Sequence, residues 1–313
     1  MTDRDELTGW MRALRRDFHR QPEFGFEESR TASVVAETLR ELGWDVVTGV
    51  GGTGVVATLA RGRSNRAIGL RADMDALRIT EATGAAWAST RDGLMHDCGH
   101  DGHTAMLLGA ARLLAREGGF DGTVRLIFQP AEEWGQGALA MLADGLMTRF
   151  PFQEVYGLHN MPGLPLGHLE TRAGAIMSAE DLFEITMTGQ GGHASMPHAV
   201  REVMVPACAL VTALQTIVSR RLDPSQIAVL SVTELLTDGT RNALPGHARI
   251  LGDARSFSAE VSARVEAEMR RIAEGIATQH GIAAQVDYTR EFVPLINDAE
   301  LADAVMQAAA GVS

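Results

Sequence analysis

The sequence contains no lysine, because all 28 basic residues among its 313 are arginine. This absence excludes catalysis through a lysine Schiff base and phosphate binding by a lysine-containing loop. The only two cysteines, Cys98 and Cys208, are too few for a disulfide framework. No apolar run approaches the length of a membrane span, and no export signal is visible near the start. We therefore expect a cytoplasmic protein with no membrane partner.

The charge balance is acidic, with 40 Asp and Glu residues and a net charge of −12. This balance argues against a general surface for nucleic acid or anionic membranes. Hydrophobic residues make up 45% of the chain and charged residues 22%, which is typical of a globular protein. The length is sufficient for one large domain or two ordinary ones. An enzyme or a binding protein for a small molecule is the expected class.

The first half of the chain alternates between helical and strand patterns of hydrophobicity. Helices are predicted at residues 31–42, 104–115 and 136–142. Strands are predicted at residues 55–59, 67–70, 123–128 and 154–158. Strands that alternate with helices predict an α/β domain whose mostly parallel sheet is covered on both faces.

The second half has a different order of elements. Its predicted elements are strand 182–188, helix 203–219, strands 227–234 and 248–257, helix 259–280 and strand 283–290. This βαββαβ order predicts a small two-layer, ferredoxin-like domain. Residues 292–312 return to a helical pattern. We therefore predict domains at 1–179, 180–290 and 291–313, with the last returning to the first domain, and a boundary near Ala179.

Reactive side chains gather in four clusters in the first half of the chain. The clusters are residues 71–75, residues 96–103, the pair Glu132-Glu133, and His159. Three of the four directly follow predicted strands. Because ligand sites in open α/β sheets lie at the carboxyl ends of strands, we expect the clusters to converge in one crevice.

One set of these residues combines sulfur, nitrogen and oxygen donors: Cys98, His100, Glu133 and His159. Thiolate and imidazole suit zinc and related metals, and zinc or manganese accepts the carboxylate. Taken alone, Cys98 is equally a small buried hydrophobe, and His100 and His103 are equally solvated residues at a helix start. Three histidines and a cysteine within eight residues, followed by paired carboxylates, favour a metal site.

The pair Glu132-Glu133 lies at a predicted strand end, where adjacent side chains point in different directions. One glutamate can therefore bind a metal while the other faces a metal-bound water and takes its proton. The alternative is a solvated first turn of a helix, where acidic residues are common. The upstream cluster favours the catalytic interpretation.

Loops of the second half present further polar candidates. The glycine-rich segment 189–195 carries His193, which could donate to an oxyanion or be merely solvated. Asn242 is equally a turn former, and Arg255 is either a clamp for a substrate carboxylate or part of a surface ion pair. Cys208, in an apolar helix, is predicted to lie in the core.

Seven short segments, in order along the chain, carry a resemblance to a known family. They are residues 19–23, 70–77, 95–107, 129–133, 157–160, 191–195 and 242–245. The sequence resembles the dinuclear-metal aminoacylase and carboxypeptidase family. Within that family it is similar to the amidohydrolase branch of hippurate hydrolases, N-acyl-amino-acid amidohydrolases and auxin-conjugate hydrolases.

The resemblance implies roles for individual residues. It implies two divalent cations per subunit, zinc or manganese or cobalt, held by the ligands Cys98, His100, Glu133 and His159. It makes Glu132 the general base and acid, and Asp75 a carboxylate behind the metal site. His193 would stabilise the tetrahedral intermediate and Asn242 would help to hold the substrate, both from an inserted lid domain through which the protein forms a homodimer.

The implied reaction is hydrolysis of the amide bond of an N-acyl amino acid or similar small conjugate, by a metal-bound water that Glu132 activates. The family usually continues past the position of Ser313 with a further segment and a final histidine ligand. Arg78, Asp97 and Trp134 also depart from the usual family residues. A first alternative is therefore a truncated or inactive member that serves as a non-catalytic dimerisation or binding protein. A second is a cysteine hydrolase that uses Cys98 with His100 or His159.

Overall fold

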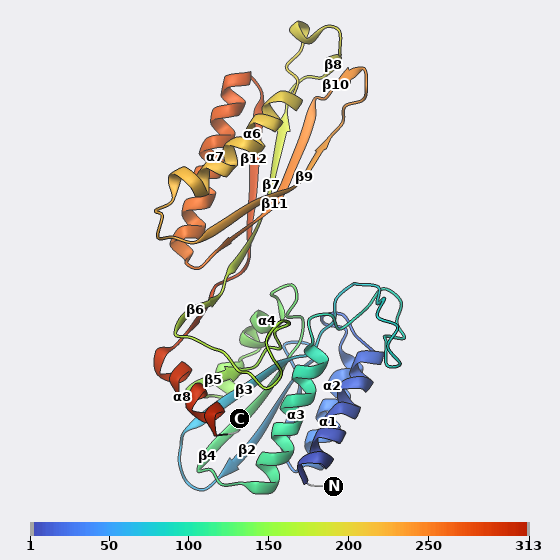
Figure 1. Cartoon of the computed structure of the whole chain (residues 1–313), viewed down its shortest axis with the longest axis vertical. Coiled ribbons are helices and arrows are strands. Elements are labelled where there is room, and N and C mark those ends of the chain that lie inside the picture. The colour runs from blue at the N-terminus through green and yellow to red at the C-terminus, as the bar shows by residue number, and fades with distance from the viewer. Residues whose placement is uncertain (1–2, 312–313) are drawn as a thin grey trace. The chain divides into compact units, whose positions relative to one another are not determined.

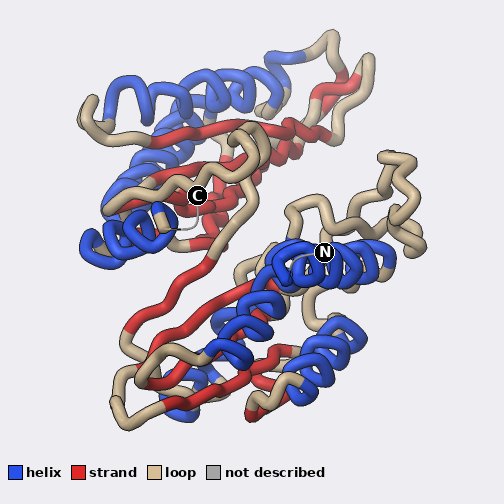
Figure 2. Tube along the Cα trace, turned by 60° about the horizontal axis from the view of Figure 1, so that its bottom comes forward, coloured by secondary structure: helices blue, strands red, loops and turns tan. Residues whose placement is uncertain are grey.

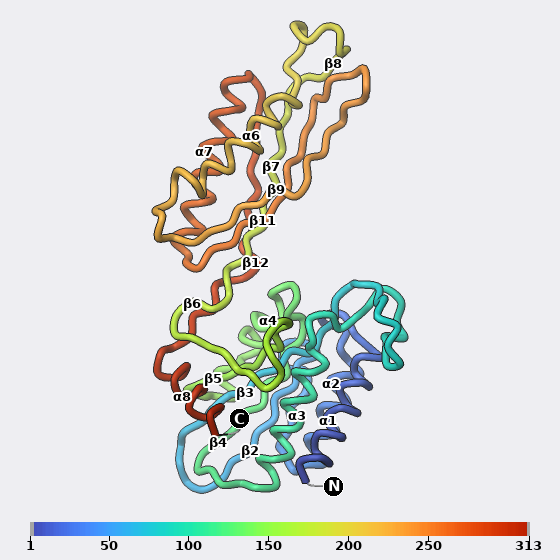
Figure 3. The backbone as a smooth tube through the Cα atoms, in the orientation of Figure 1, coloured from blue at the N-terminus to red at the C-terminus, as the bar shows by residue number. Residues whose placement is uncertain are grey.

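The computed structural model describes residues 3–311, and the chain divides into two compact units at residues 164 and 165. Figure 1 labels the elements of each unit, and Figure 3 follows the chain through them in sequence order. Each unit consists of helices packed against its own strands, as Figure 2 shows. None of the described helices is both long enough and apolar enough to cross a bilayer.

The first unit contains five helices and five strands among its described residues. The helices are α1 (Asp3–Arg20), α2 (Ser29–Glu41), α3 (His100–Glu117), α4 (Gly137–Ala143) and α5 (Leu146–Arg149). The strands are β1 (Asp45–Val50), β2 (Gly54–Arg61), β3 (Ala67–Asp73), β4 (Gly122–Gln129) and β5 (Glu154–Gly157). Of these, α1, β1 and α5 had not been predicted.

The sheet of the first unit is mixed, so the prediction of a mostly parallel sheet was wrong. Its strand order is β1-β2-β4-β3-β5; the β1/β2 and β2/β4 pairs are antiparallel, and the β3/β4 and β3/β5 pairs are parallel. The physical reason is the short turn after β1, which joins β1 to β2 as a hairpin. Helix α3 provides the crossover that a parallel β3/β4 pair requires.

Alternating side chains of the central strands bury both faces of this sheet. On one face, Val55 of β2 and Leu126 of β4 pack with residues of α1, α2 and α3, such as Phe18. On the other face, Val56 and Ile127 pack with residues of α4 and α5. This two-residue period is that of a strand with a core on each side. The predicted cover on both faces is therefore present.

The second unit contains the predicted βαββαβ order. Its main elements are β7 (Ala179–Thr188), α6 (Met204–Thr216), β9 (Ala228–Thr237), β11 (His247–Ser256), α7 (Ala259–His280) and β12 (Ala283–Phe292). The four strands form an antiparallel sheet in the order β12-β7-β11-β9. Helices α6 and α7 pack on the same face of the sheet around one core (Figure 1).

Short elements complete the second unit. They are β6 (Gly174–Met177), β8 (Gly192–His193), the 3₁₀ turn Pro197–Ala199, the π turn Ile217–Arg221, β10 (Ala243–Leu244), β13 (Leu295–Asn297) and α8 (Ala299–Ala310). Strand β13 pairs with β6, so the predicted helical segment 292–312 begins with a strand, and its Val312 lies outside the described residues.

The prediction that Cys208 lies in the core was wrong, because its side chain is exposed on α6. The sequence of α6 is apolar almost throughout, with both buried Leu210 and exposed Val205. Periodicity therefore did not reveal which side of the helix faces solvent.

Candidate metal centre

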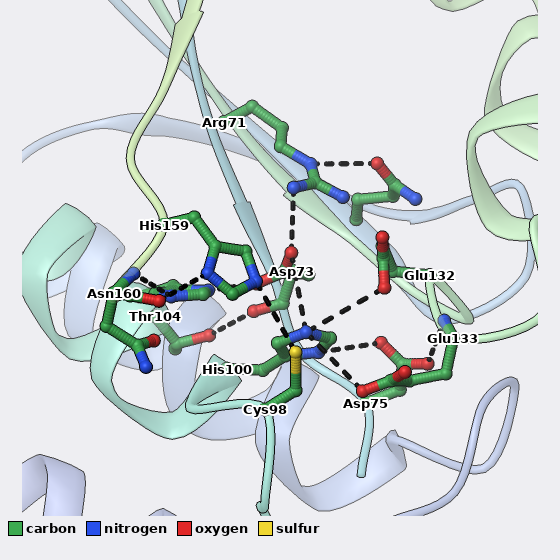
Figure 4. A network of polar contacts seen from close by, with 12 residues as sticks. Arg71, Asp73, Asp75, Cys98, His100, Thr104, Glu132, Glu133, His159 and Asn160 are labelled. Atoms are coloured by element: carbon green, nitrogen blue, oxygen red, sulfur yellow. Dashed lines mark hydrogen bonds and ion pairs between the residues drawn. The ribbon is translucent and has the colours of Figure 1, made fainter. Parts of the chain in front are cut away.

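Three parallel strands end at the same edge of the first sheet and supply most of the polar cluster. Asp73 is the last residue of β3, Glu132 and Glu133 follow β4, and His159 lies two residues after β5. His100 is the first residue of α3. In Figure 4 the aspartate and glutamate side chains surround the His100 ring.

His100 lies at the centre of the cluster. Its side chain is fully buried, and its Nε2 has no hydrogen-bond partner. This nitrogen lies 3.8 Å from Glu132 Oε2, 3.7 Å from Glu133 Oε1 and 3.7 Å from Asp73 Oδ2. A buried imidazole nitrogen aimed at carboxylate oxygens beyond hydrogen-bond distance is an arrangement that a cation between them would complete.

The preceding Gly99 allows this placement of His100. Its backbone is left-handed, with φ of +87°, and a Cβ there would lie 2.2 Å from the side-chain oxygen of Asn160. Glycine alone tolerates both the conformation and the close approach. The close packing against Asn160 also brings α3 next to His159.

Cys98 and His159 lie together on the other side of His100. Cys98 Sγ is 3.4 Å from His159 Nε2, and ligand atoms of Cys98, His100 and His159 lie within 4.8 Å of one another. His159 Nδ1 lies 2.6 Å from the Asn160 carbonyl oxygen, to which it can only donate. That hydrogen bond turns Nε2 toward the sulfur and the centre of the cluster.

Asp75 lies behind the cluster and holds two of its members. Its Oδ1 is 3.2 Å from His100 Nδ1, and its Oδ2 accepts a hydrogen bond from the Glu133 backbone N–H at 3.0 Å. Because the carboxylate can only accept, the neutral His100 ring carries its proton on Nδ1 and has its lone pair on Nε2. This is the tautomer that a metal ligand needs.

Sequence reasoning gave no role to two buried members of the cluster, Asp73 and His103. His103 Nδ1 donates to Asp73 Oδ1 at 2.6 Å, and its Nε2 accepts the Asn160 backbone N–H at 3.1 Å. With both nitrogens engaged, His103 orients its neighbours. Their spacing in the sequence could have revealed both residues. Asp73 lies two residues before Asp75, and His103 lies one helical turn after His100, so each is expected near a residue already assigned to the site.

The electrostatics of the cluster reflect crowded, partly buried charges. Burial raises the pKa of Glu133 to about 7, and the neighbouring carboxylates add to the effect. Burial also raises the pKa of Glu132. Burial opposes protonation of His100, but contacts with Asp75 and Cys98 and the charge of Asp73 raise its pKa to about 11. A divalent cation would relieve the crowding of the carboxylates.

Contacts between Cys98 and its histidine neighbours shift the remaining titratable groups. The hydrogen bond with Cys98 raises the pKa of His159 to about 9. Contacts with His100 and His159 lower the pKa of the Cys98 thiol. A thiol that ionises readily is suited to metal ligation.

The donor set fits a metal ion on two independent observations. His100 Nε2 and Glu133 Oε1 are buried atoms without a hydrogen-bond partner. The potential ligands also form three groups that share His100: Cys98 with His100 and His159; Asp73 with His100 and His103; and His100 with Glu132 and Glu133. The four sequence-predicted ligands and Glu132 thus lie in one place.

The remaining predicted site residues lie in the second unit. His193 in β8 pairs with Ala243 of β10, and Ala194 N–H donates to the Asn242 carbonyl at 3.0 Å, so His193 and Asn242 are close neighbours. The Arg255 guanidinium binds Glu180 at 2.5 Å and Asp253 at 2.9 Å, which is the geometry of the ion-pair alternative.

Comparison with known proteins identifies the family. A sequence model described as peptidase family M20/M25/M40 matches residues 69–313. The chain belongs to this family. The resemblance seen in the motifs is therefore confirmed, including its amidohydrolase branch.

Individual relatives cover most of the chain. The hippurate hydrolase of Campylobacter jejuni is 40% identical over 282 residues, which are 90% of this chain and 73% of that protein. The N-acetyl-L-cysteine deacetylase of Bacillus subtilis is 39% identical over 297 residues, 95% of this chain and 71% of that protein. The B. subtilis YXEP protein, a dinuclear metal binding peptidase, has a TM-score of 0.84 and 33% identity, covering 98% of this chain and 81% of that one.

Proposed function

We propose that this protein hydrolyses the amide bond of N-acyl amino acids with the help of two divalent metal ions. The observation that carries the proposal is the convergence of Cys98, His100, Glu133 and His159 on one centre that Glu132 also faces. The names of the relatives support the substrate class, because hippurate and N-acetylcysteine are both N-acyl amino acids.

The proposed ligands are Cys98, His100, Glu133 and His159, with thiolate, imidazole and carboxylate donors that suit zinc or manganese. Bound cations would supply Lewis acidity and make a water molecule more acidic. Asp75 would keep His100 in the ligating tautomer and hold the backbone of Glu133.

Glu132 is the proposed proton carrier. It would take a proton from the attacking water and return it to the nitrogen of the departing amino acid. The raised pKa of Glu132 supports both transfers, since an ordinary glutamate is too weak a base at neutral pH.

His193 and Asn242 are proposed to act on the substrate from the second unit. His193 Nδ1 accepts the Ser195 backbone N–H at 3.2 Å, so the neutral ring carries its proton on Nε2. That N–H would donate to the oxyanion of the tetrahedral intermediate. Asn242 would help to hold the substrate.

We also propose a homodimer formed through the second unit. Strand β9 lies at the edge of the four-stranded sheet and exposes Val229 and Leu236. A long edge strand with exposed apolar side chains is suited to pairing with a second copy.

The test compares metal content and hydrolysis of N-acyl amino acids in three variants. Glu132→Gln should keep its metal and lose about 10²–10⁴-fold in kcat, the usual contribution of general acid–base catalysis. Cys98→Ala should lose metal and activity together. Cys208→Ala, which changes the exposed cysteine, is the matched control and should lose neither.

Three results would contradict the proposal. Near-normal turnover in Glu132→Gln would show that Glu132 is not the general base. Unchanged metal stoichiometry in Cys98→Ala would show that Cys98 is not a metal ligand. A metal-loaded wild type that hydrolyses no N-acyl amino acid would favour the non-catalytic binding protein.

A further inference from the structure

The turn that carries the two glutamates has an unusual backbone. Ala131, directly before Glu132, has φ of +43°, although it is not glycine. A left-handed conformation is unfavourable for alanine, so it persists only where the surroundings impose it. The contacts of Ala131 therefore show what fixes the direction of Glu132.

The side-chain hydrogen bond to Ala131 comes from Glu28, which precedes α2 and lies 103 positions earlier in the sequence. Its Oε1 accepts the Ala131 backbone N–H at 2.8 Å, and its Oε2 accepts the Thr53 hydroxyl at 2.5 Å. Glu28 is 0% exposed and makes no side-chain cap to its own helix. A lone buried carboxylate is costly, and burial raises the pKa of Glu28.

Two glycines pack closely against the same turn. A Cβ on Gly25 would lie 2.9 Å from Ala131 Cα, and one on Gly137 would lie 1.5 Å from the Pro130 carbonyl oxygen. Gly137 N–H also donates to the Ala131 carbonyl at 3.0 Å. The backbone before Glu132 is thus enclosed by main chain, and Glu28 provides its side-chain anchor.

Glu132 lies between this anchor and a second one. The backbone N–H of the next residue, Glu133, is held by Asp75 at 3.0 Å. Asp75 belongs to the metal centre, whereas Glu28 contacts none of the metal-binding groups by hydrogen bond. Loss of the Glu28 contact would therefore release the backbone before Glu132, while the hydrogen bond from Asp75 would still hold the backbone of Glu133.

We propose that Glu28 is a positioning residue for catalysis, which holds Ala131 in its left-handed conformation and so aims Glu132 at the attacking water. The inference rests on the proposed function, because it concerns the proton carrier of that reaction. It assigns to Glu28 an effect on kcat that is separate from substrate binding and from metal binding.

The test replaces Glu28 in two ways. Glu28→Met keeps the side-chain volume but removes the acceptor, and it should lower kcat by about 10²-fold, as expected for a misplacement of about 1 Å. KM and metal content should stay near the wild-type values. Glu28→Gln should stay close to wild type, because its amide oxygen can accept from Ala131 while its NH₂ donates to the Thr53 hydroxyl.

A second substitution tests the backbone conformation itself. Glycine adopts φ of +43° without strain, so Ala131→Gly combined with Glu28→Met should recover part of the lost kcat. If Glu28→Met does not fold, Thr53→Val replaces it as the test. That variant leaves Glu28 with one partner fewer and should lower kcat by a smaller factor at unchanged metal content.

The outcomes separate this inference from the proposed function. An active wild type with unchanged kcat in Glu28→Met, or in Thr53→Val if that variant is needed, would overturn the positioning role. The positioning role would also be overturned if Glu28→Gln lost as much kcat as Glu28→Met and if adding Ala131→Gly to Glu28→Met recovered none of the lost kcat. If the metal-loaded wild type has no activity, the proposed function fails, and a crystal structure of Glu28→Met decides the inference: a retained φ of +43° at Ala131 would refute it.

Discussion

Asp75→Asn is the sharpest test of the metal centre, because Asp75 accepts hydrogen bonds from two groups that belong to different ligands. The donors are His100 Nδ1 at 3.2 Å and the Glu133 backbone N–H at 3.0 Å. Asparagine has one side-chain oxygen, so only one of these donors keeps an acceptor and the other faces an NH₂ group. Either His100 changes tautomer or the Glu133 backbone moves.

Both changes should weaken metal binding at nearly constant side-chain volume. Loss of a partner that orients a ligand typically costs 10–100-fold in metal affinity. That range corresponds to about 1.4–2.8 kcal/mol, at about 1.4 kcal/mol per factor of ten. Titration calorimetry with Zn²⁺ after chelator treatment would measure the change, with metal analysis giving the stoichiometry.

The matched control is Asp181→Asn in the second unit. Asp181 is also buried, but it accepts from the hydroxyl groups of Ser262 and Tyr288. Both hydroxyl groups donate to the same oxygen, Oδ2, so the single amide oxygen of asparagine can accept from both, and metal affinity should not change. Wild-type affinity in Asp75→Asn, or an equal loss in Asp181→Asn, would refute the reasoning.

Two further predictions concern stability and assembly. Burial lowers the pKa of His96 from 6.5 to about 4, so only the unfolded chain protonates it between these values. The free energy of unfolding should therefore fall by up to about 3 kcal/mol between pH 6.5 and pH 4 because of this residue. Urea unfolding at pH 5 and pH 8 would measure this difference, and His96→Leu should remove the part that comes from His96. An unchanged pH dependence in His96→Leu would contradict the assignment. Sedimentation velocity should give the wild type the mass of two chains and Leu236→Lys the mass of one chain. A monomeric wild type would contradict the proposed dimer.

The convergence of the site was predictable because it depends on local patterns. Three of the four reactive clusters follow a recognisable hydrophobic strand, as Glu132-Glu133 follows β4 and His159 follows β5. These strands and β3 are mutually parallel, so their carboxyl ends meet at one edge. The order of the main elements in the second unit was predictable for the same reason, because their hydrophobic patterns are local to each segment.

The remainder of the fold depended on contacts that no local pattern contains. Strand β1 (DVVTGV) mixes polar and apolar residues without a clean alternation, and missing it concealed the hairpin that makes the sheet mixed. The outward position of Cys208 depends on which side of an apolar helix meets the sheet. The contact between Glu28 and Ala131 joins residues 103 positions apart, and a glutamate near a helix start predicts only a solvated first turn.

The arrangement of acceptors explains how side chains from separate segments present their ligand atoms to one point. His100 Nδ1 faces Asp75, and His159 Nδ1 faces the Asn160 carbonyl. In both rings the nitrogen away from the centre donates, so in the neutral ring the lone pair of the other nitrogen points inward. Glu133 is oriented through its backbone by the same Asp75. The residues behind the ligands therefore determine the geometry of the centre as much as the ligands do.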